Sequence, residues 1–87
     1  MRRSLCNWTH RDVTSFLQQK GFSFFEDVDG VGQTWMNFHD SGEPDRMVEV
    51  KFEDAFYKAK ALKRMIRQSG IPEEEWIRWM ELQENRY

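Results

Sequence analysis

The stretch from Gly32 to Gly42 places the tightest constraint on how this chain of 87 residues can fold. Turn-forming residues border it on both sides: Asp29-Gly30 precede it, and the segment 40–45, Asp-Ser-Gly-Glu-Pro-Asp, closes it. Between these turns the residues fall into two alternating sets. One set is Thr34, Met36 and Phe38, and the other is Trp35, Asn37 and His39. Because successive side chains of a strand point to opposite faces, this stretch is predicted to be a half-buried β-strand.

Strands are predicted on both sides of this central strand. Residues 22–28 contain three Phe and a Val, and a glycine-containing loop at 29–32 joins them to the central strand. Residues 47–52 alternate again, with Val48, Val50 and Phe52 on one face. Three consecutive strands with short turns predict an antiparallel meander.

Helices are predicted before and after the strands. Thr9 with Asp12 has the form of an N-terminal capping box for a helix over 10–20, and Gly21 ends it. A second helix is predicted over 53–69, ended by Gly70, with a buried stripe made of Ala55, Ala59, Leu62 and Ile66. Pro72 and three glutamates then begin a last helix, whose apolar residues are Trp76, Ile77, Trp79, Met80 and Leu82.

The predicted order is therefore α-β-β-β-α-α, an α+β fold with a three-stranded antiparallel sheet and helices on one face. The length suits a single domain over 1–87, with an N-terminal tail at 1–8 and a frayed C-terminal tail at 83–87.

Composition excludes several classes of site. Cys6 is the only cysteine, so the chain can form neither an intrachain disulfide nor a cysteine-based zinc site. The acidic residues near the turns lack a metal-ligand spacing, and Gly30-Val31-Gly32 does not open a helix, so no metal, nucleotide or other cofactor is predicted. No apolar run reaches the length of a membrane span and no signal-peptide core follows Met1, so we expect a cytoplasmic protein.

The order of elements and two segments resemble the HicA-like (YcfA-like) family of mRNA-cleaving toxins. One segment is 61–76, Ala-Leu-Lys-Arg-Met-Ile-Arg-Gln-Ser-Gly-Ile-Pro-Glu-Glu-Glu-Trp, which is similar to the family's second helix, glycine turn and short acidic helix. The other runs from Thr9 to Lys20-Gly21-Phe22 and is similar to its first helix. The resemblance spans about residues 9–80. It implies a fold like that of double-stranded-RNA-binding domains, RNA as a ligand and an antitoxin-like or host protein as a partner.

The resemblance breaks at the position of the family's catalytic residue. The family's central strand opens with Gly-Ser-His, whose His is taken to be catalytic, and the matching positions here are Gly32, Gln33 and Thr34. Threonine has no pKa near neutrality and cannot act as a general acid or base. The chain is therefore expected to be a small RNA-binding or toxin-like protein without the family's ribonuclease activity.

Only His10 and His39 could transfer protons near neutral pH with an unperturbed pKa. His39 is a weak catalytic candidate, and it is also read as a turn residue bonded to Asp40 or Asp45. His10, in the first turn of a helix, is expected to be a surface residue. An active ribonuclease that uses either histidine stays as an alternative.

The residues best suited to contact RNA phosphates are the basic side chains of the second predicted helix. Lys60, Lys63, Arg64 and Arg67 fall on one side of it, away from the buried stripe. The competing interpretation is an ordinary solvated helix face.

The outer face of the central strand offers Trp35, Asn37 and His39 as a platform on which RNA bases could stack and form hydrogen bonds. Alternatively, the last helix covers these residues with Trp76 and Trp79. In a third interpretation the chain is a protein-interaction module or a phage or mobile-element regulator, in which Trp35 and the Trp76/Trp79 helix dock a protein partner or a second copy in a homodimer.

Overall fold

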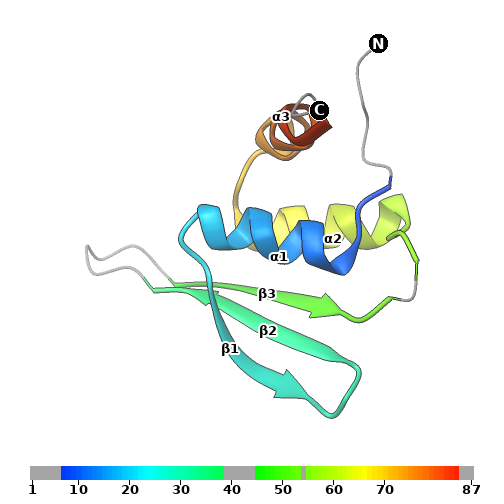
Figure 1. Cartoon of the computed structure of the whole chain (residues 1–87). Helices are drawn as coiled ribbons and strands as arrows, with labels where there is room; N and C mark the ends of the chain where they lie inside the picture. The colour runs from blue at the N-terminus through cyan, green and yellow to red at the C-terminus, as the bar shows by residue number, and fades with distance from the viewer. Residues whose placement is uncertain (1–6, 39–44, 54, 85–87) are drawn as a thin grey trace.

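The computed structural model describes residues 7–38, 45–53 and 55–84 of the chain. Its elements are α1 (His10–Gln19), β1 (Ser23–Val28), β2 (Gly32–Asn37), β3 (Arg46–Lys51), α2 (Ala59–Ser69) and α3 (Glu73–Glu84). The strands form one antiparallel sheet in the order β1-β2-β3, and α1 and α2 lie side by side over one face of it (Figure 1). The predicted α+β class and the order α-β-β-β-α-α are confirmed.

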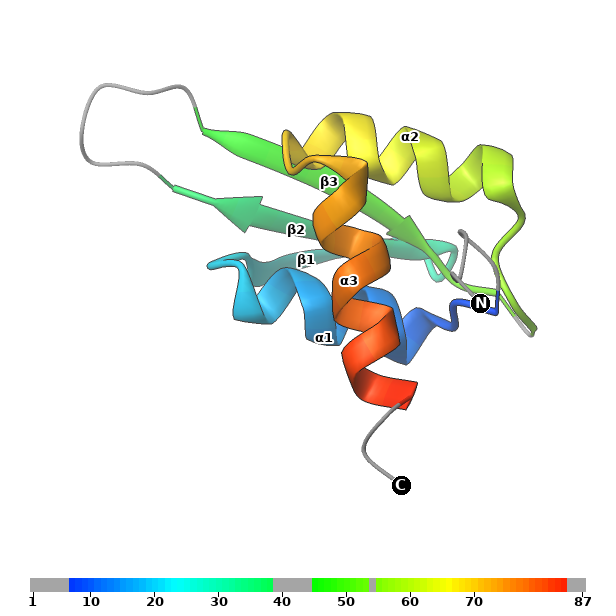
Figure 2. The same cartoon turned by 90° about the horizontal axis from the view of Figure 1, so that it is seen from above.

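Helix α3 makes a third layer. It crosses over α1 and α2 on the side away from the sheet (Figure 2). An aromatic cluster packs α3 against the rest of the protein. The ring centroid of Trp76 lies 5.4 Å from that of Trp8 and 4.3 Å from that of Phe16, and Trp79 stacks on Trp8 with a centroid distance of 5.5 Å. All four side chains are buried, so this cluster forms the outer half of the core.

Helix α1 forms where its local sequence predicts it. The Thr9 hydroxyl accepts a hydrogen bond from the Asp12 amide at 3.2 Å, and the Thr9 amide donates to the Asp12 carboxylate at 3.0 Å. This capping box satisfies amides that the first turn of a helix leaves unpaired. Val13, Phe16 and Leu17 form the buried face of α1.

The turn between β1 and β2 sets the register of the sheet. Asp29 and Gly30 both have positive φ, and the amide of Val31 donates to the carbonyl of Val28 at 2.8 Å. At Gly32 the backbones of β2 and β3 approach so closely that a Cβ atom would lie 2.7 Å from the Val50 carbonyl oxygen. Only glycine fits there without a shift of the strand.

Helix α2 begins six residues later than predicted. The predicted start was Glu53, and the helix starts at Ala59 after the extended residue Lys58. The side chain of Tyr57 is buried, its amide donates to the Trp8 carbonyl at 2.8 Å, and its hydroxyl donates to the Lys51 carbonyl. These contacts hold the chain extended between the sheet and the helix layer.

The predicted buried stripe of this helix changes accordingly. Ala55 lies outside α2, and both Ala55 and Ala59 are exposed. The buried residues of α2 are Leu62, Met65 and Ser69, with Ile66 half-buried. The observed stripe therefore shares Leu62 with the predicted one, and Met65 and Ser69 take the place of the two alanines.

The alternation of β2 is confirmed, but its two faces are exchanged relative to the prediction. Trp35 pairs with Val48 and Gln33 pairs with Val50, and both valines are buried under the helices. Since paired residues point to the same side of a sheet, Trp35 faces the helices. The uncovered face, which we call the open face, carries Thr34 and Met36 instead.

Candidate nucleic-acid interface

Four basic side chains line the outward side of α2. Lys60, Lys63, Arg64 and Arg67 are all exposed, and at 100° per residue they fall within an arc of about 100°. The buried residues of the helix lie on the opposite side. We call these four residues the basic strip, and their predicted arrangement on one side of a helix is confirmed by their positions in α2.

The basic strip has no neutralising partner within the described part of the chain. Helix α2 contains no acidic residue, and none of the four side chains forms an ion pair or a side-chain hydrogen bond with a described residue. Arg64 differs from the other three in bordering a small hollow of ≈ 40 Å³ that Glu49 and Glu53 also line. Lys60, Lys63 and Arg67 therefore offer the least compensated positive charge.

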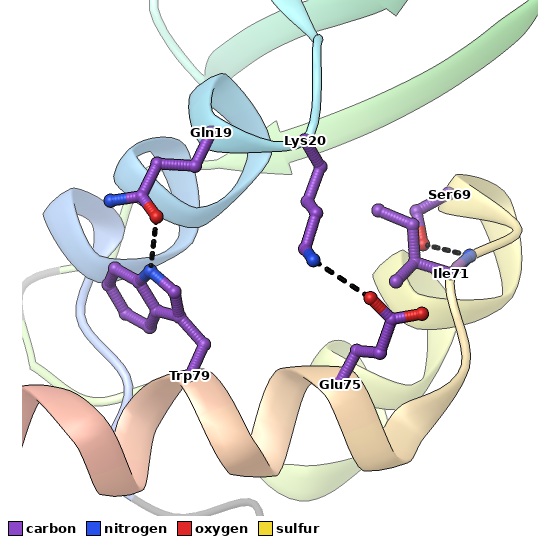
Figure 3. Close-up of polar contacts among 6 residues, drawn as sticks. All are labelled: Gln19, Lys20, Ser69, Ile71, Glu75 and Trp79. Atoms are coloured by element: carbon purple, nitrogen blue, oxygen red, sulfur yellow. Dashed lines mark hydrogen bonds and ion pairs between the residues drawn. The ribbon is translucent and has the colours of Figure 1, made fainter.

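Glu75 of α3 is paired with α1 and not with the basic strip. Glu75 forms an ion pair with Lys20 at 2.8 Å, and the indole nitrogen of Trp79 donates to the Gln19 side chain at 3.0 Å (Figure 3). Both contacts join α3 to the end of α1. In the turn between α2 and α3, the Ser69 hydroxyl accepts a hydrogen bond from the Ile71 amide at 3.0 Å (Figure 3).

Thr34 occupies a site that suits neither proton transfer nor phosphate binding. It is 6 % exposed and lies on the open face between its two cross-strand partners, Glu26 on β1 and Glu49 on β3. A hydroxyl does not titrate near neutrality, and two flanking carboxylates repel a phosphate.

The proposed base-stacking platform is wrong for Trp35. Its side chain is 7 % exposed, faces the helices and donates from its indole nitrogen to the Gln33 side chain at 3.1 Å. Asn37 lies on the same helix-covered side, half-buried, with its amide group close to Gly21. His39, like Asp40 and Gly42, lies outside the described residues. The prediction failed because both faces of β2 carry apolar residues, so alternation alone does not tell which one is covered.

His10 is not the surface residue that the sequence predicts. Its ring packs against Phe52 at a centroid distance of 5.1 Å, and its Nε2 atom is buried without a hydrogen-bond partner among the described residues. An enclosed nitrogen cannot reach a substrate, so this geometry gives no support to His10 as a catalytic group.

Trp76 and Trp79 are also unavailable to a docking partner in this structure. Both belong to the aromatic cluster that holds α3, and both are buried. They do not cover Trp35, as one interpretation had it, because they pack on Trp8 and Phe16. Of the last helix's apolar residues, Leu82 is the exposed one.

The exposed aromatic residues of the sheet were missed by sequence analysis. Phe24 and Phe25 on β1 and Phe38 after β2 are each about half exposed, and the rings of Phe25 and Phe38 contact each other with centroids 6.2 Å apart. The signal was present in the run Phe22-Ser23-Phe24-Phe25, in which two adjacent Phe cannot both face one core.

Among residues 7–38, 45–53 and 55–84, no group of His, Cys, Asp and Glu side chains is arranged to hold a metal ion. None of the helices in that part of the chain combines the length and apolarity needed to cross a membrane. Comparisons with protein-family models, with curated proteins and with solved structures find no match to this chain.

Proposed function

We propose that this protein binds RNA through its basic strip, by contacts to the phosphate backbone. The observation that carries the proposal is the uncompensated charge of α2: four exposed cations within one arc, with no acid in the helix and no ion pair to a described residue. Such a strip can follow a phosphate backbone, and each contact releases condensed counterions from the nucleic acid.

The rest of the surface favours backbone recognition over recognition of bases. Trp35, the aromatic residue expected to stack on bases, is buried, and the open face carries Glu26 and Glu49. The strip spans the eight residues 60–67, and its first and last residues are about 10 Å apart along the helix. Because a duplex concentrates more phosphate charge along its axis than a single strand, we expect double-stranded RNA to bind more tightly, with little dependence on sequence.

Cleavage is not part of the proposal. Thr34 has the wrong chemistry at the position where the resembling family has its His, and His10 has an enclosed Nε2. The alternative of protein docking through Trp35, Trp76 and Trp79 also lacks support, because all three side chains are buried and cannot contact a partner.

The test is fluorescence anisotropy with labelled single- and double-stranded RNA at low and at physiological salt. We expect binding that weakens steeply as salt increases and that is lost in Lys63→Glu/Arg67→Glu. The matched control is Arg11→Glu/Arg78→Glu, which makes the same change in net charge at exposed positions of α1 and α3. Absence of binding to both RNAs at low salt would refute the proposal.

A further inference from the structure

The two edges of the sheet differ in the hydrogen bonding of their outward backbone groups. At the β3 edge, the amide of Glu49 points outward and donates to the side chain of Gln68 on α2 at 3.0 Å. At the β1 edge, no hydrogen bond joins the outward backbone groups to any described residue. Five of the six residues of β1 are exposed, and Figure 1 shows it as an edge strand below the helix layer. An edge strand of this kind is a template for pairing with another extended chain.

Apolar side chains flank this open edge. Phe24 lies against Trp35 on the helix-covered side, with ring centroids 6.2 Å apart, and is 49 % exposed. Phe25 lies against Phe38 and is 54 % exposed. An added strand beside β1 would cover both rings, so backbone pairing there would also bury apolar surface.

The charge of the edge selects the partner. The next two residues of β1, Glu26 and Asp27, are exposed, and the strand contains no basic residue. Glu49 adds a third carboxylate on the row of the sheet that contains Glu26 and Thr34. Phosphate is repelled by this surface, whereas lysine and arginine side chains are attracted to it.

The same charges disfavour a second copy of this chain. Antiparallel pairing of two β1 strands would gather the four carboxylates of two Glu26-Asp27 pairs along one seam. In addition, the register of β1 shifts between Phe24 and Glu26, a bulge that interrupts regular pairing. Acidic residues and bulges at edges are devices against self-association, and a cationic segment would overcome the first of them.

We propose that β1 is a docking site for an extended segment of a partner protein in which two adjacent apolar residues stand next to two adjacent lysine or arginine residues, as Phe24-Phe25 stand next to Glu26-Asp27. The segment adds as a fourth strand beside β1. Its backbone pairs with the outward groups of β1, its apolar side chains cover Phe24 and Phe25, and its cationic side chains face Glu26 and Asp27. This site is separate from the basic strip and does not depend on RNA binding.

The probe is a labelled peptide of about eight residues in which pairs of valines alternate with pairs of lysines, a length that matches one strand. We expect it to bind in fluorescence anisotropy and to shift the amide resonances of β1. The same peptide with glutamate in place of every lysine should not bind. The lysine–valine peptide N-methylated at every residue should also fail, because it keeps the charge and loses all backbone donors. This arm uses the unaltered protein, so it is independent of how variants fold.

Charge-reversal variants locate the site. Glu26→Lys/Asp27→Lys should weaken binding of the lysine–valine peptide about tenfold or more, the scale set by two cross-strand charge pairs. The matched control, Glu73→Lys/Glu74→Lys at the start of α3, changes the net charge equally and should retain affinity. Equal loss in both variants, equal binding of the N-methylated peptide, or no binding of the lysine–valine peptide at all would each overturn the proposal.

Discussion

The salt dependence of the proposed RNA binding is the quantity that the geometry of α2 predicts most directly. For a duplex, the logarithm of the affinity falls with the logarithm of salt by about 0.9 for each phosphate neutralised. Four contacts from the basic strip therefore give a slope of about −3.6. Between about 50 and about 200 mM salt, the affinity should fall by about a hundredfold.

Removing two contacts should halve this slope. The variant Lys63→Gln/Arg67→Gln leaves Lys60 and Arg64 and should show a slope of about −1.8, so its affinity should fall only about tenfold over the same salt range. We choose Lys63 and Arg67 because Arg64 lies beside Glu49 and Glu53. Anisotropy titrations at four or more salt concentrations with one duplex measure both slopes.

The control separates local contacts from overall charge. Arg11→Gln/Arg78→Gln also removes two positive charges, which changes the formal net charge from −2 to −4. It should keep the slope of the unaltered protein, because neither arginine belongs to α2. If the two double variants show the same slope, the binding reflects overall charge and the assignment to the basic strip is refuted.

Three further changes test the fold that presents these surfaces. Gly32→Ala should lower the free energy of unfolding by about 1–3 kcal/mol in a urea titration, because its Cβ would lie 2.7 Å from the Val50 carbonyl oxygen and 2.9 Å from Lys51 Cα; an unchanged midpoint would contradict the close approach of β2 and β3. Burial, and secondarily the charge of Glu53, raises the pKa of Tyr57 from its ordinary value of 10.0 to about 12. In the unfolded chain Tyr57 has its ordinary pKa and loses its proton first, so the free energy of unfolding should fall as pH increases from about 10 to 12. Tyr57→Phe should remove that part of the pH dependence, and identical profiles would contradict the burial. His10→Phe removes the buried Nε2 that lacks a described partner and keeps a ring against Phe52, so it should leave the melting temperature unchanged or raise it; a lower melting temperature would show that the nitrogen has a stabilising partner.

Local sequence signals predicted most of the fold because the elements begin and end on local chemistry. The capping box of Thr9 and Asp12 fixes the start of α1, and the positive φ angles of Asp29 and Gly30 fix the turn between β1 and β2. These features act over three or four residues, so their physical cause is visible in the sequence itself.

The start of α2 depends on distant residues and could not be read locally. Residues 53–58 continue an apolar pattern that suits a helix. Tyr57, however, forms hydrogen bonds to the carbonyl of Trp8, which is far away along the chain, and to the carbonyl of Lys51 at the end of β3. Tertiary contacts override helix propensity there. In contrast, the basic strip was predictable, because charged residues on one side of a helix need only the helical repeat to come together.

The exchanged faces of β2 have a consequence for the whole candidate site. With Trp35 under the helices, the aromatic and the basic surfaces no longer coincide: Phe24 and Phe25 flank the β1 edge, and the basic strip belongs to α2, which packs on β3 at the other edge. The acidic residues divide in the same way, since Glu26 and Asp27 lie on β1 and α2 has none. One ligand that needed both stacking and phosphate contacts would have to span the sheet and pass these carboxylates. The two ligands that we propose, a phosphate backbone at α2 and a cationic strand at β1, would each supply the charge that complements its surface.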